Sequence, residues 1–389
     1  MQKTGLTTTM TASAKPFRLL HFQSLATSGG DESNSLLLCR YLPDMDHRIA
    51  VYFGAGPMEQ AWHDAGAVVT LLKLNPSSRR ALMTAVRRTV AATRPDGVFL
   101  SSVILLPLVL KCLDGFKGPV LCHTGNPENS SLGTRVKFWA ARAWLRPNVQ
   151  VTMLHCSDYV RKSFLRSSFY RRYRHEVAIS AGLMGSTEHA RPHVPRVVSR
   201  DDPVRVGMLA RLDPIKNHRL VIDGFRLILE NYPRAKLEFI GEGSEMENLK
   251  TRARTLGLSD RVIFHGRLPS PFPVAREWDL FLYGTTPAEG FGAALAEAIA
   301  LGLPCVVTDV GPMREVGGEE GAVCYVRADS DSELAASATE LLGDYPRRCL
   351  MSERSRARAE ARFDGACFAE KIKQCLLTAS EREAASFVA

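Results

Sequence analysis

The stretch Ala190–His218, with the sequence ARPHVPRVVSRDDPVRVGMLARLDPIKNH, divides the chain into two parts. It begins with a polar segment that contains three prolines, which is typical of a linker. The apolar run Val204–Leu209 follows, and its length and composition indicate a buried strand. A polar loop then leads into a helical pattern. We therefore expect a linker over residues 191–203 and a new βα unit directly after it.

The same alternation of short apolar runs and amphipathic stretches extends to both sides of this linker. Before it, the strand-like runs are Phe17–Phe22, Ile49–Phe53, Val68–Leu72, Gly97–Leu100, Pro119–His123 and Val149–Leu154. After it, they are Val204–Leu209, Lys236–Ile240, Val262–Phe264, Leu280–Tyr283 and Cys305–Thr308. Helical patterns cover Arg79–Ala92, Gly133–Leu145, Ser157–Ser168, Asn217–Glu230, Glu245–Leu256 and Phe291–Leu301. This rhythm predicts parallel sheets covered by helices on both faces.

The predicted fold class is therefore α/β, with two Rossmann-like, doubly wound domains that face each other across a cleft. We place the N-terminal domain at residues 17–190 and the C-terminal domain at residues 204–365. Residues 1–16 lack the apolar core of a secretory signal, so we expect a disordered leader. The last part of the chain is helix-prone without strands, and we expect residues 366–389 to form a helix that packs back on the N-terminal domain.

Composition excludes several classes of protein. Hydrophobic residues make up 45% and charged residues 23% of the 389 positions, which is typical of a globular protein. No apolar run approaches the ~20 residues of a membrane-spanning helix. The nine cysteines are scattered without a C-x-x-C pair, so we expect a reduced, cytoplasmic protein rather than a disulfide framework or a zinc site.

The net charge of +9 is unevenly distributed. Residues 1–200 contain 26 Lys and Arg against 12 Asp and Glu, whereas residues 201–389 contain 24 against 29. The first part should therefore meet something anionic, such as a membrane surface or a phosphorylated ligand. Its basic residues gather between aromatic residues in two groups: Arg161, Lys162, Arg166, Arg171, Arg172 and Arg174, and Arg135, Lys137, Arg142 and Arg146. Such segments can lie at a membrane interface; alternatively, the aromatic residues pack in the core.

The stretch Glu289-Gly-Phe-Gly-Ala-Ala-Leu-Ala-Glu297 is the most specific candidate for a binding site. Its small residues allow a ligand to approach the backbone at the start of a helix, where free N–H groups suit a phosphate. The two carboxylates can accept hydrogen bonds from sugar hydroxyls. In the loop after the strand Val204–Leu209, Arg211 and Lys216 could neutralise a diphosphate. Alone, each of these features is more often an ordinary helix cap or a solvated charge.

Two further candidates lie in the first part of the chain. Gly29-Gly30 follows the first predicted strand and allows a tight turn beside a phosphate, although it is not the G-x-G-x-x-G of dinucleotide-binding proteins. His123 ends a strand and leads into a loop, so it should point into the cleft. Asp44-Met-Asp46 has the Asp-x-Asp spacing of a metal motif, but it lies before the second strand. We expect a solvated turn there and assign no metal.

Taken in order, these pieces resemble the retaining glycosyltransferases of the GT-B fold, in the broad family 4 grouping (glycosyl transferases group 1). The resemblance is strongest from Val204 to Val326. It includes Gly241-Glu-Gly243, Val262-Ile-Phe-His-Gly266, Asp279-Leu-Phe-Leu and Pro304-Cys-Val-Val-Thr308 besides the candidates above. It implies that the N-terminal domain binds the acceptor and that the C-terminal domain binds the nucleotide sugar.

The resemblance also implies roles for the matching residues. The catalytic residues would be His123, Glu289, Arg211 and Lys216. The donor would further contact Gly29, Gly30, Arg267, Leu268, Phe291, Gly292, Ala293 and Glu297. Within this set, Arg211 and Lys216 would bind the diphosphate, Glu297 the ribose hydroxyls and Glu289 the donor sugar, while Arg267 and Leu268 would lie beside the base.

The implied reaction is the retaining transfer of a sugar from a nucleotide-diphosphate donor to a hydroxyl acceptor, in the synthesis of a polysaccharide, glycolipid or other glycoconjugate. No metal and no other cofactor is expected. The expected partners are the nucleotide sugar, a lipid-linked or phosphorylated acceptor and an anionic membrane surface on the cytoplasmic side, but no nucleic acid. The alternatives are a sugar-nucleotide epimerase-like enzyme and a basic, peripheral membrane-binding protein that retains the GT-B shell.

Overall fold

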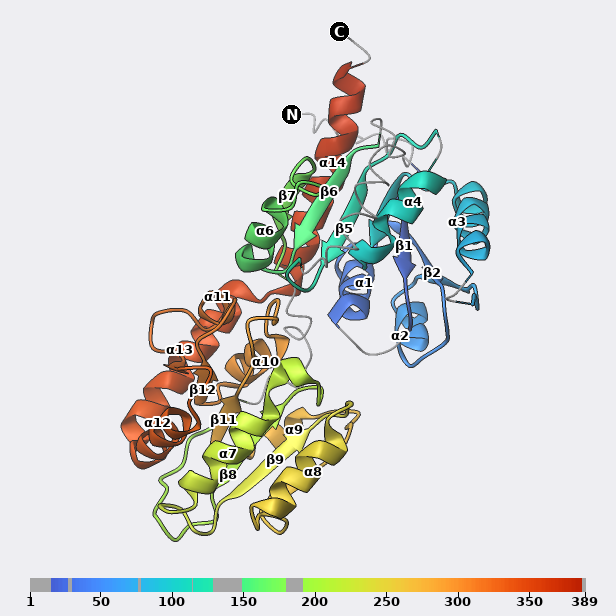
Figure 1. Ribbon diagram of the computed structural model, residues 1–389. Helices are drawn as coiled ribbons and strands as arrows, with labels where there is room; N and C mark the ends of the chain where they lie inside the picture. The colour runs from blue at the N-terminus through green and yellow to red at the C-terminus, as the bar shows by residue number, and fades with distance from the viewer. Residues whose placement is uncertain are drawn as a thin grey trace, which may run out of the picture.

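The protein forms two α/β domains joined by a linker and by a pair of long helices (Figure 1). The computed structural model describes residues 15–26, 30–75, 78–113, 115–128, 149–179 and 192–386. Most of the expected leader and the predicted helix Gly133–Leu145 lie outside the described residues. Both domains consist of a parallel sheet with helices on either face, which confirms the predicted fold class.

The N-terminal domain is built on a seven-stranded sheet of order β3-β2-β1-β4-β5-β6-β7. Its strands are β1 (Arg18–Gln23), β2 (Asp46–Val51), β3 (Val68–Leu71), β4 (Gly97–Leu100), β5 (Val120–Thr124), β6 (Val151–His155) and β7 (Arg174–Val177). The described helices are α1 (Gly30–Tyr41), α2 (Met58–Asp64), α3 (Arg79–Thr93), the short η1 (Val103–Leu105), α4 (Leu106–Cys112) and α6 (Asp158–Leu165). The prediction missed β7, because its Arg-His-Glu-Val sequence lacks the apolar run of a buried strand.

The C-terminal domain repeats this arrangement with a six-stranded sheet of order β10-β9-β8-β11-β12-β13. Its strands are β8 (Arg205–Leu209), β9 (Lys236–Ile240), β10 (Val262–Phe264), β11 (Leu280–Tyr283), β12 (Cys305–Thr308) and β13 (Cys324–Val326). Its helices are η3 (Pro214–Lys216), α7 (His218–Ile228), α8 (Met246–Thr255), α9 (Phe272–Ala275), α10 (Ala293–Leu301), α11 (Met313–Gly317), α12 (Asp331–Gly343) and α13 (Tyr345–Arg362). All five predicted strands are confirmed, and the three-residue β13 was missed.

The strand order reverses direction at a switch point in each sheet, between β1 and β4 and between β8 and β11. Loops at the carboxyl ends of strands beside such a point form the usual binding crevice of this architecture. The loops that follow β5 and β6 contact the loop that follows β11, because Ser157 donates a hydrogen bond to the Gly290 carbonyl at 2.6 Å. The carboxyl edges of the two sheets therefore face each other.

The linker is fastened to the C-terminal domain. Arg196 forms an ion pair of 2.7 Å with Asp279, which is almost fully buried at the start of β11. The buried Arg348 of α13 donates a hydrogen bond to the Arg196 carbonyl at 2.9 Å. Residues 192–203 thus leave the crevice side of the molecule free.

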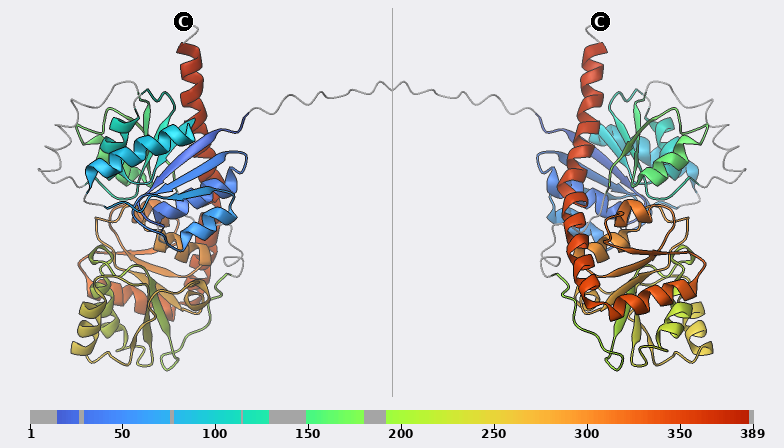
Figure 2. Two further views of the ribbon diagram at one scale, coloured as in Figure 1. Left: turned by 90° about the vertical axis from the view of Figure 1, so that its right-hand side faces the viewer. Right: turned by 90° about the vertical axis from the view of Figure 1, so that its left-hand side faces the viewer.

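The last helix, α14 (Gly365–Ser386), returns to the N-terminal domain (Figure 2). It contributes Phe368, Ala369, Ile372, Cys375 and Leu376 to an apolar cluster with Leu19 of β1, Phe99 of β4, Leu121 of β5 and Leu154 of β6. Lys371 of α14 also pairs with Glu176 of β7 at 2.8 Å. The end of the chain is thus part of the core of the first domain.

We predict that Ile372→Ala lowers the free energy of unfolding of the N-terminal domain by about 2–5 kcal/mol, because Ile372 is fully buried between α14 and the sheet. Denaturant unfolding would measure this loss. Leu377→Ala is the matched control, because this neighbouring side chain is 40% exposed and its truncation should change stability by no more than ~0.5 kcal/mol. Equal effects of the two variants would contradict the packing of α14.

Candidate active site

The centre of the candidate site is a buried ion pair between the two loops at the switch point of the second sheet. Lys216 ends η3 after β8, and Glu289 lies in the loop after β11. Their Nζ and Oε2 atoms are 2.5 Å apart, and the two side chains are only 12% and 7% exposed. The structure therefore joins two candidates that are distant in sequence.

Glu289 is held by five donors. Its Oε2 accepts from Lys216, from the Tyr283 hydroxyl at 2.7 Å and from the Thr285 hydroxyl at 3.2 Å. Its Oε1 accepts from the backbone N–H groups of Gly290 and Gly292, each at 3.2 Å. Both carboxylate oxygens are thus engaged within the protein, and Glu289 organises the loop that leads into α10.

Tyr283 and Thr285 were not among the predicted site residues. In the sequence, Tyr283 is the last residue of an apolar strand, so nothing distinguishes it from a core residue. Its hydroxyl accepts from Lys216 at 3.0 Å while donating to Glu289. Of the three Lys216 N–H donors, the hydrogen bonds to Glu289 and Tyr283 use two, and one remains for a ligand.

The charge of this centre follows from its pairing. Burial by itself would raise the pKa of Glu289, but the Lys216 ammonium and the hydrogen bonds from Lys216 and Tyr283 hold that pKa below its ordinary value. Burial, followed by the charge of Glu289, raises the pKa of Tyr283. Glu289 is therefore ionised at neutral pH, and Tyr283 remains a neutral hydrogen-bond donor.

The loop ends at the N-terminus of α10, where no side chain caps the first turn. Gly292 precedes the helix with a φ of +85°, and a Cβ at this position would meet Met313 at 2.5 Å. The free N–H groups next to it, together with the helix dipole, suit an anionic group. Phe291 packs edge to face on Phe363 in the core, so only its backbone can face a ligand, whereas Ala293 is exposed.

Glu297 lies one turn into α10 and is partly exposed. Among the described residues it has neither a hydrogen bond nor an ion pair, although its carboxyl is close enough to Lys216 to feel that charge. Burial raises its pKa from 4.5 to about 8, and Lys216 offsets only part of this shift. The Glu297 carboxyl group can therefore accept hydrogen bonds from a ligand. Its burial without such hydrogen bonds is unfavourable, because it loses solvation by water.

The remaining donor candidates of the C-terminal domain lie in the loops after β8 and β10. The side chain of Arg211 is 71% exposed and pairs with Asp213 at 2.8 Å, so it is not joined to Lys216. Arg267 is exposed and Leu268 half-buried, directly after the Gly266 turn that follows β10. The Gly266 carbonyl accepts from the Gly241 N–H at 2.9 Å, which places this turn beside the end of β9.

The N-terminal domain reaches the centre through the loop after β5. His123 is 3% exposed, and its Nε2 lies 3.3 Å from Asn34 Nδ2 of α1, so it is enclosed rather than directed freely into a cleft. Two residues later, Gly125 touches Gly290: a Cβ on Gly290 would lie 1.8 Å from the Gly125 carbonyl oxygen. Gly30 begins α1, and Gly29 lies outside the described residues.

The Asp-x-Asp candidate lies elsewhere. Asp46 begins β2 at the edge of the sheet opposite its carboxyl end, and it binds Arg18 and Arg48 at 2.6 Å each. Asp44 occupies an exposed turn. Within the described ranges, no three His, Cys, Asp or Glu side chains are grouped in a way that could hold a metal ion.

In the first predicted basic group, aromatic residues between the arginines pack in the core. Phe164, Phe169 and Tyr170 are at most 6% exposed. Asp158 pairs with Arg161 and Lys162, and Glu176 pairs with Arg174. The second group, Arg135–Arg146, lies outside the described residues. None of the helices in the described part is long and apolar enough to cross a membrane.

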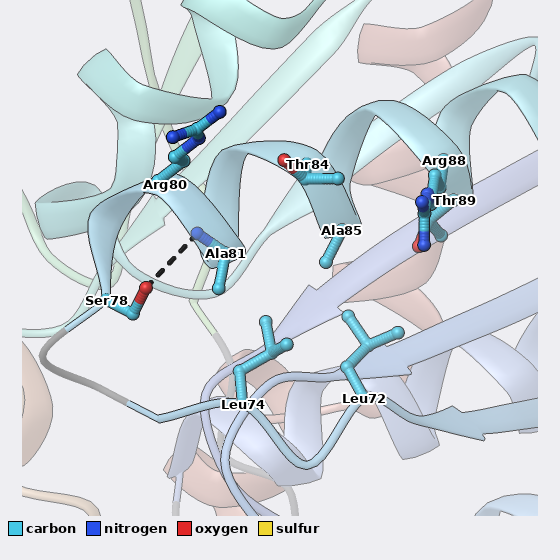
Figure 3. Close-up of a pocket in the computed structure, with 9 residues that line it drawn as sticks. All are labelled: Leu72, Leu74, Ser78, Arg80, Ala81, Thr84, Ala85, Arg88 and Thr89. Carbon is cyan, nitrogen blue, oxygen red and sulfur yellow. Dashed lines mark hydrogen bonds between the residues drawn. The ribbon is translucent and has the colours of Figure 1, made fainter.

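A different basic surface accompanies a groove of about 590 Å³ beside α3 (Figure 3). Leu72 and Leu74, which follow β3, face Ala81 and Ala85 of the helix. The helix carries Arg79, Arg80, Arg87 and Arg88, and it contains neither Asp nor Glu. These arginines are exposed and have no carboxylate partner among the described residues. The sequence analysis did not single out α3, because its arginines lack neighbouring aromatic residues.

Known proteins resemble this chain both in sequence and in fold. Residues 192–358 match the family model of "Glycosyl transferases group 1". The structure of Anabaena Alr3699/HepE in complex with UDP and glucose superposes with a TM-score of 0.75 at 18% identity, over 92% of this chain and 99% of that one. The chain thus has the GT-B fold, and its residues 192–358 are similar to the group 1 glycosyl transferases.

Two curated relatives are similar in parts of their sequences. The lipopolysaccharide core biosynthesis mannosyltransferase LpsB of Rhizobium meliloti is 32% identical over 174 residues, which is 42% of this chain and 48% of that protein. The N-acetyl-alpha-D-glucosaminyl L-malate synthase of Bacillus anthracis is 32% identical over 151 residues, which is 38% of this chain and 39% of that protein. The matches therefore span less than half the length of either relative.

We predict that Glu297→Gln stabilises the unliganded protein, and that this gain grows as the pH rises from 5 to 9. The folded-state pKa of about 8 lies above the ordinary 4.5, so the folded protein binds this proton more tightly than the unfolded chain does. Stability is therefore lost as the pH rises through this window, and Gln abolishes the loss. Thermal unfolding at several pH values measures the effect.

Glu230→Gln is the matched control, because it makes the same substitution at an exposed position. A pH-independent difference between wild type and Glu297→Gln would show that Glu297 titrates normally.

Proposed function

We propose that this protein is a retaining glycosyltransferase that moves a sugar from a nucleotide-diphosphate donor to a hydroxyl acceptor in glycoconjugate biosynthesis. The observation that carries the proposal is the site at the second switch point, where Lys216, the open start of α10 and an unpaired Glu297 adjoin one another. The named activities of the two curated relatives and the UDP bound to HepE support the choice of a nucleotide sugar.

Each part of the site suits one part of such a donor. The free Lys216 N–H, the α10 N-terminus and the exposed guanidinium of Arg211 would stabilise the charge that develops on a departing diphosphate. Glu297 would accept hydrogen bonds from the ribose hydroxyls, and Arg267 and Leu268 would lie against the base. Because these charges are fixed in the protein, a divalent ion is unnecessary for this step.

The state of Glu289 supports a mechanism without a covalent glycosyl-enzyme. A carboxylate that forms hydrogen bonds through both oxygens to five donors is a poor nucleophile. We therefore propose that the acceptor attacks from the face from which the diphosphate departs, and that a diphosphate oxygen takes the acceptor proton. This route retains the configuration at the anomeric carbon.

We predict that a nucleoside diphosphate or its sugar raises the unfolding temperature. Arg211→Gln and Glu297→Gln should each require at least a tenfold higher ligand concentration to reach the same shift. At ~100 times its dissociation constant, a ligand stabilises a protein by about 2.7 kcal/mol. Both variants avoid the complication of Lys216→Ala, which would leave Glu289 buried without its partner. Sugar transfer should persist in EDTA and fall in both variants.

Arg226→Gln, which changes an exposed arginine of α7, is the control and should bind as wild type does. Wild-type binding by Arg211→Gln and Glu297→Gln would disprove the assignment of the site. Transfer that disappears in EDTA and returns with Mg²⁺ would disprove metal independence. Binding without any transfer would favour a non-catalytic protein.

On the acceptor side, we propose that the N-terminal domain meets an anionic membrane surface through α3, which would place the enzyme peripherally on the cytoplasmic face. Four exposed arginines on a helix that contains no Asp or Glu attract anionic headgroups. The groove floor of Leu72, Leu74, Ala81 and Ala85 supplies apolar surface beside them. A lipid-linked acceptor would then reach the crevice from this side.

We predict that the protein sediments with anionic vesicles at low salt, and not with neutral vesicles or at high salt. Each basic residue near such a surface contributes about 1 kcal/mol, so Arg80→Gln/Arg88→Gln should weaken binding about 30-fold. The control pair Arg226→Gln/Arg254→Gln removes the same charge from the other domain and should change binding less than threefold. Failure of the wild type to sediment would leave a soluble phosphorylated acceptor as the better choice.

A further inference from the structure

The start of α6 in the N-terminal domain is capped by a carboxylate of the C-terminal domain. Glu315 of α11 accepts from the backbone N–H groups of Asp158 and Tyr159, at 2.7 Å and 2.6 Å, one to each oxygen. Helix N-termini attract anions, and hydrogen bonds to a charged acceptor are the strong ones. Helix α6 also has its own N-cap, Ser157, and an acidic residue in its first turn, Asp158, so Glu315 adds a second cap from the other domain.

The same turn of α6 binds the loop that carries Glu289. The Ser157 hydroxyl accepts from Val160 N–H at 3.1 Å, as an N-cap does, and donates to the Gly290 carbonyl at 2.6 Å. The Tyr159 hydroxyl donates to the Pro287 carbonyl at 2.9 Å. The carbonyls on either side of Glu289 are therefore both held by the N-terminal domain.

The fit at this contact leaves no room for side chains. Gly290 lies against the Gly125 carbonyl, and a Cβ on Gly311 would lie 3.3 Å from the Tyr159 ring. On the other side, Arg358 of α13 donates to the carbonyls of Glu315 and Val316 at 2.8 Å and 2.6 Å. Glu315 is thus presented to α6 by a helix that is itself anchored.

We propose that Glu315 is a positioning residue for sugar transfer: by capping α6 from the other domain, it holds Ser157 and Tyr159 on the loop around Glu289. This interdomain clamp, made of Glu315, Ser157, Tyr159 and the carbonyls of Pro287 and Gly290, couples closure of the crevice to the geometry of the donor site. Separation of the domains would remove the hydrogen bonds to the Pro287 and Gly290 carbonyls, so the clamp ties the position of this loop to the contact between the domains. The inference rests on the proposed function for its catalytic consequence but not for the clamp itself.

Hydrogen exchange tests the clamp without any substrate. In Glu315→Gln and Glu315→Ala, the amides of Asp158 and Tyr159 should exchange at least tenfold faster, and those of Gly290 and Gly292 should follow. Glu319→Gln is the matched control, because this 69% exposed carboxylate pairs only with Arg314 and should leave these amides unchanged. Tyr159→Phe, which removes a single hydroxyl, should accelerate Gly290 and Gly292 alone.

Kinetics then test the positioning role. Glu315→Gln should lower kcat at least tenfold while KM for the donor changes less than threefold, and the double variant with Tyr159→Phe should lose less than the product of the two losses. Unchanged exchange at residues 158, 159, 290 and 292 would overturn the clamp, whatever the activity. Faster exchange with unchanged kcat would overturn the positioning role. Absence of all sugar transfer in the wild type, with the exchange effects intact, would count against the proposed function and leave the clamp standing.

Discussion

The buried pairing of Lys216 with Glu289 is the constraint on which the site depends. A buried carboxylate and a buried ammonium are each costly in solvation, and together they persist only with further hydrogen bonds. Tyr283, Thr285 and two backbone N–H groups of the loop supply these hydrogen bonds. The shape of the residues 285–292 is therefore set by electrostatics before any ligand arrives.

The two glutamates of the Glu-x7-Glu stretch therefore have different roles. Glu289 contributes to the order of the unliganded protein, whereas Glu297 has no hydrogen-bond partner within the described part of the chain and raises the free energy of that state at high pH. A ligand with hydroxyl groups would form hydrogen bonds to Glu297 and thereby offset this increase in free energy. Glu289 is thus satisfied by hydrogen bonds within the protein, whereas Glu297 is not, and this difference favours the binding of a ligand at Glu297.

Much of the fold could be predicted from sequence because its signals are local. Apolar runs such as Val204–Leu209 and Leu280–Tyr283 announce buried parallel strands, whereas β7 and β13 are short and partly polar and give no such signal. The Lys216–Glu289 pair joins segments 73 residues apart, so its existence follows from the sheet order and not from either motif. Glu315 was missed because a single glutamate in a helix carries no pattern. In the cluster Arg161–Arg174, the aromatic residues Phe164, Phe169 and Tyr170 are buried, as the second of the two interpretations of this segment expected.

The return of α14 to the first sheet has a consequence for how the chain is made. The apolar cluster of the N-terminal domain includes Ile372 and Leu376, which are synthesised after the entire C-terminal domain. At 5–20 residues per second, about 10–40 s separate the last strand of the first sheet from these residues. During translation the face formed by Leu19, Phe99, Leu121 and Leu154 is therefore covered only in part, by Leu37, Leu38 and Leu42, until α14 has been synthesised.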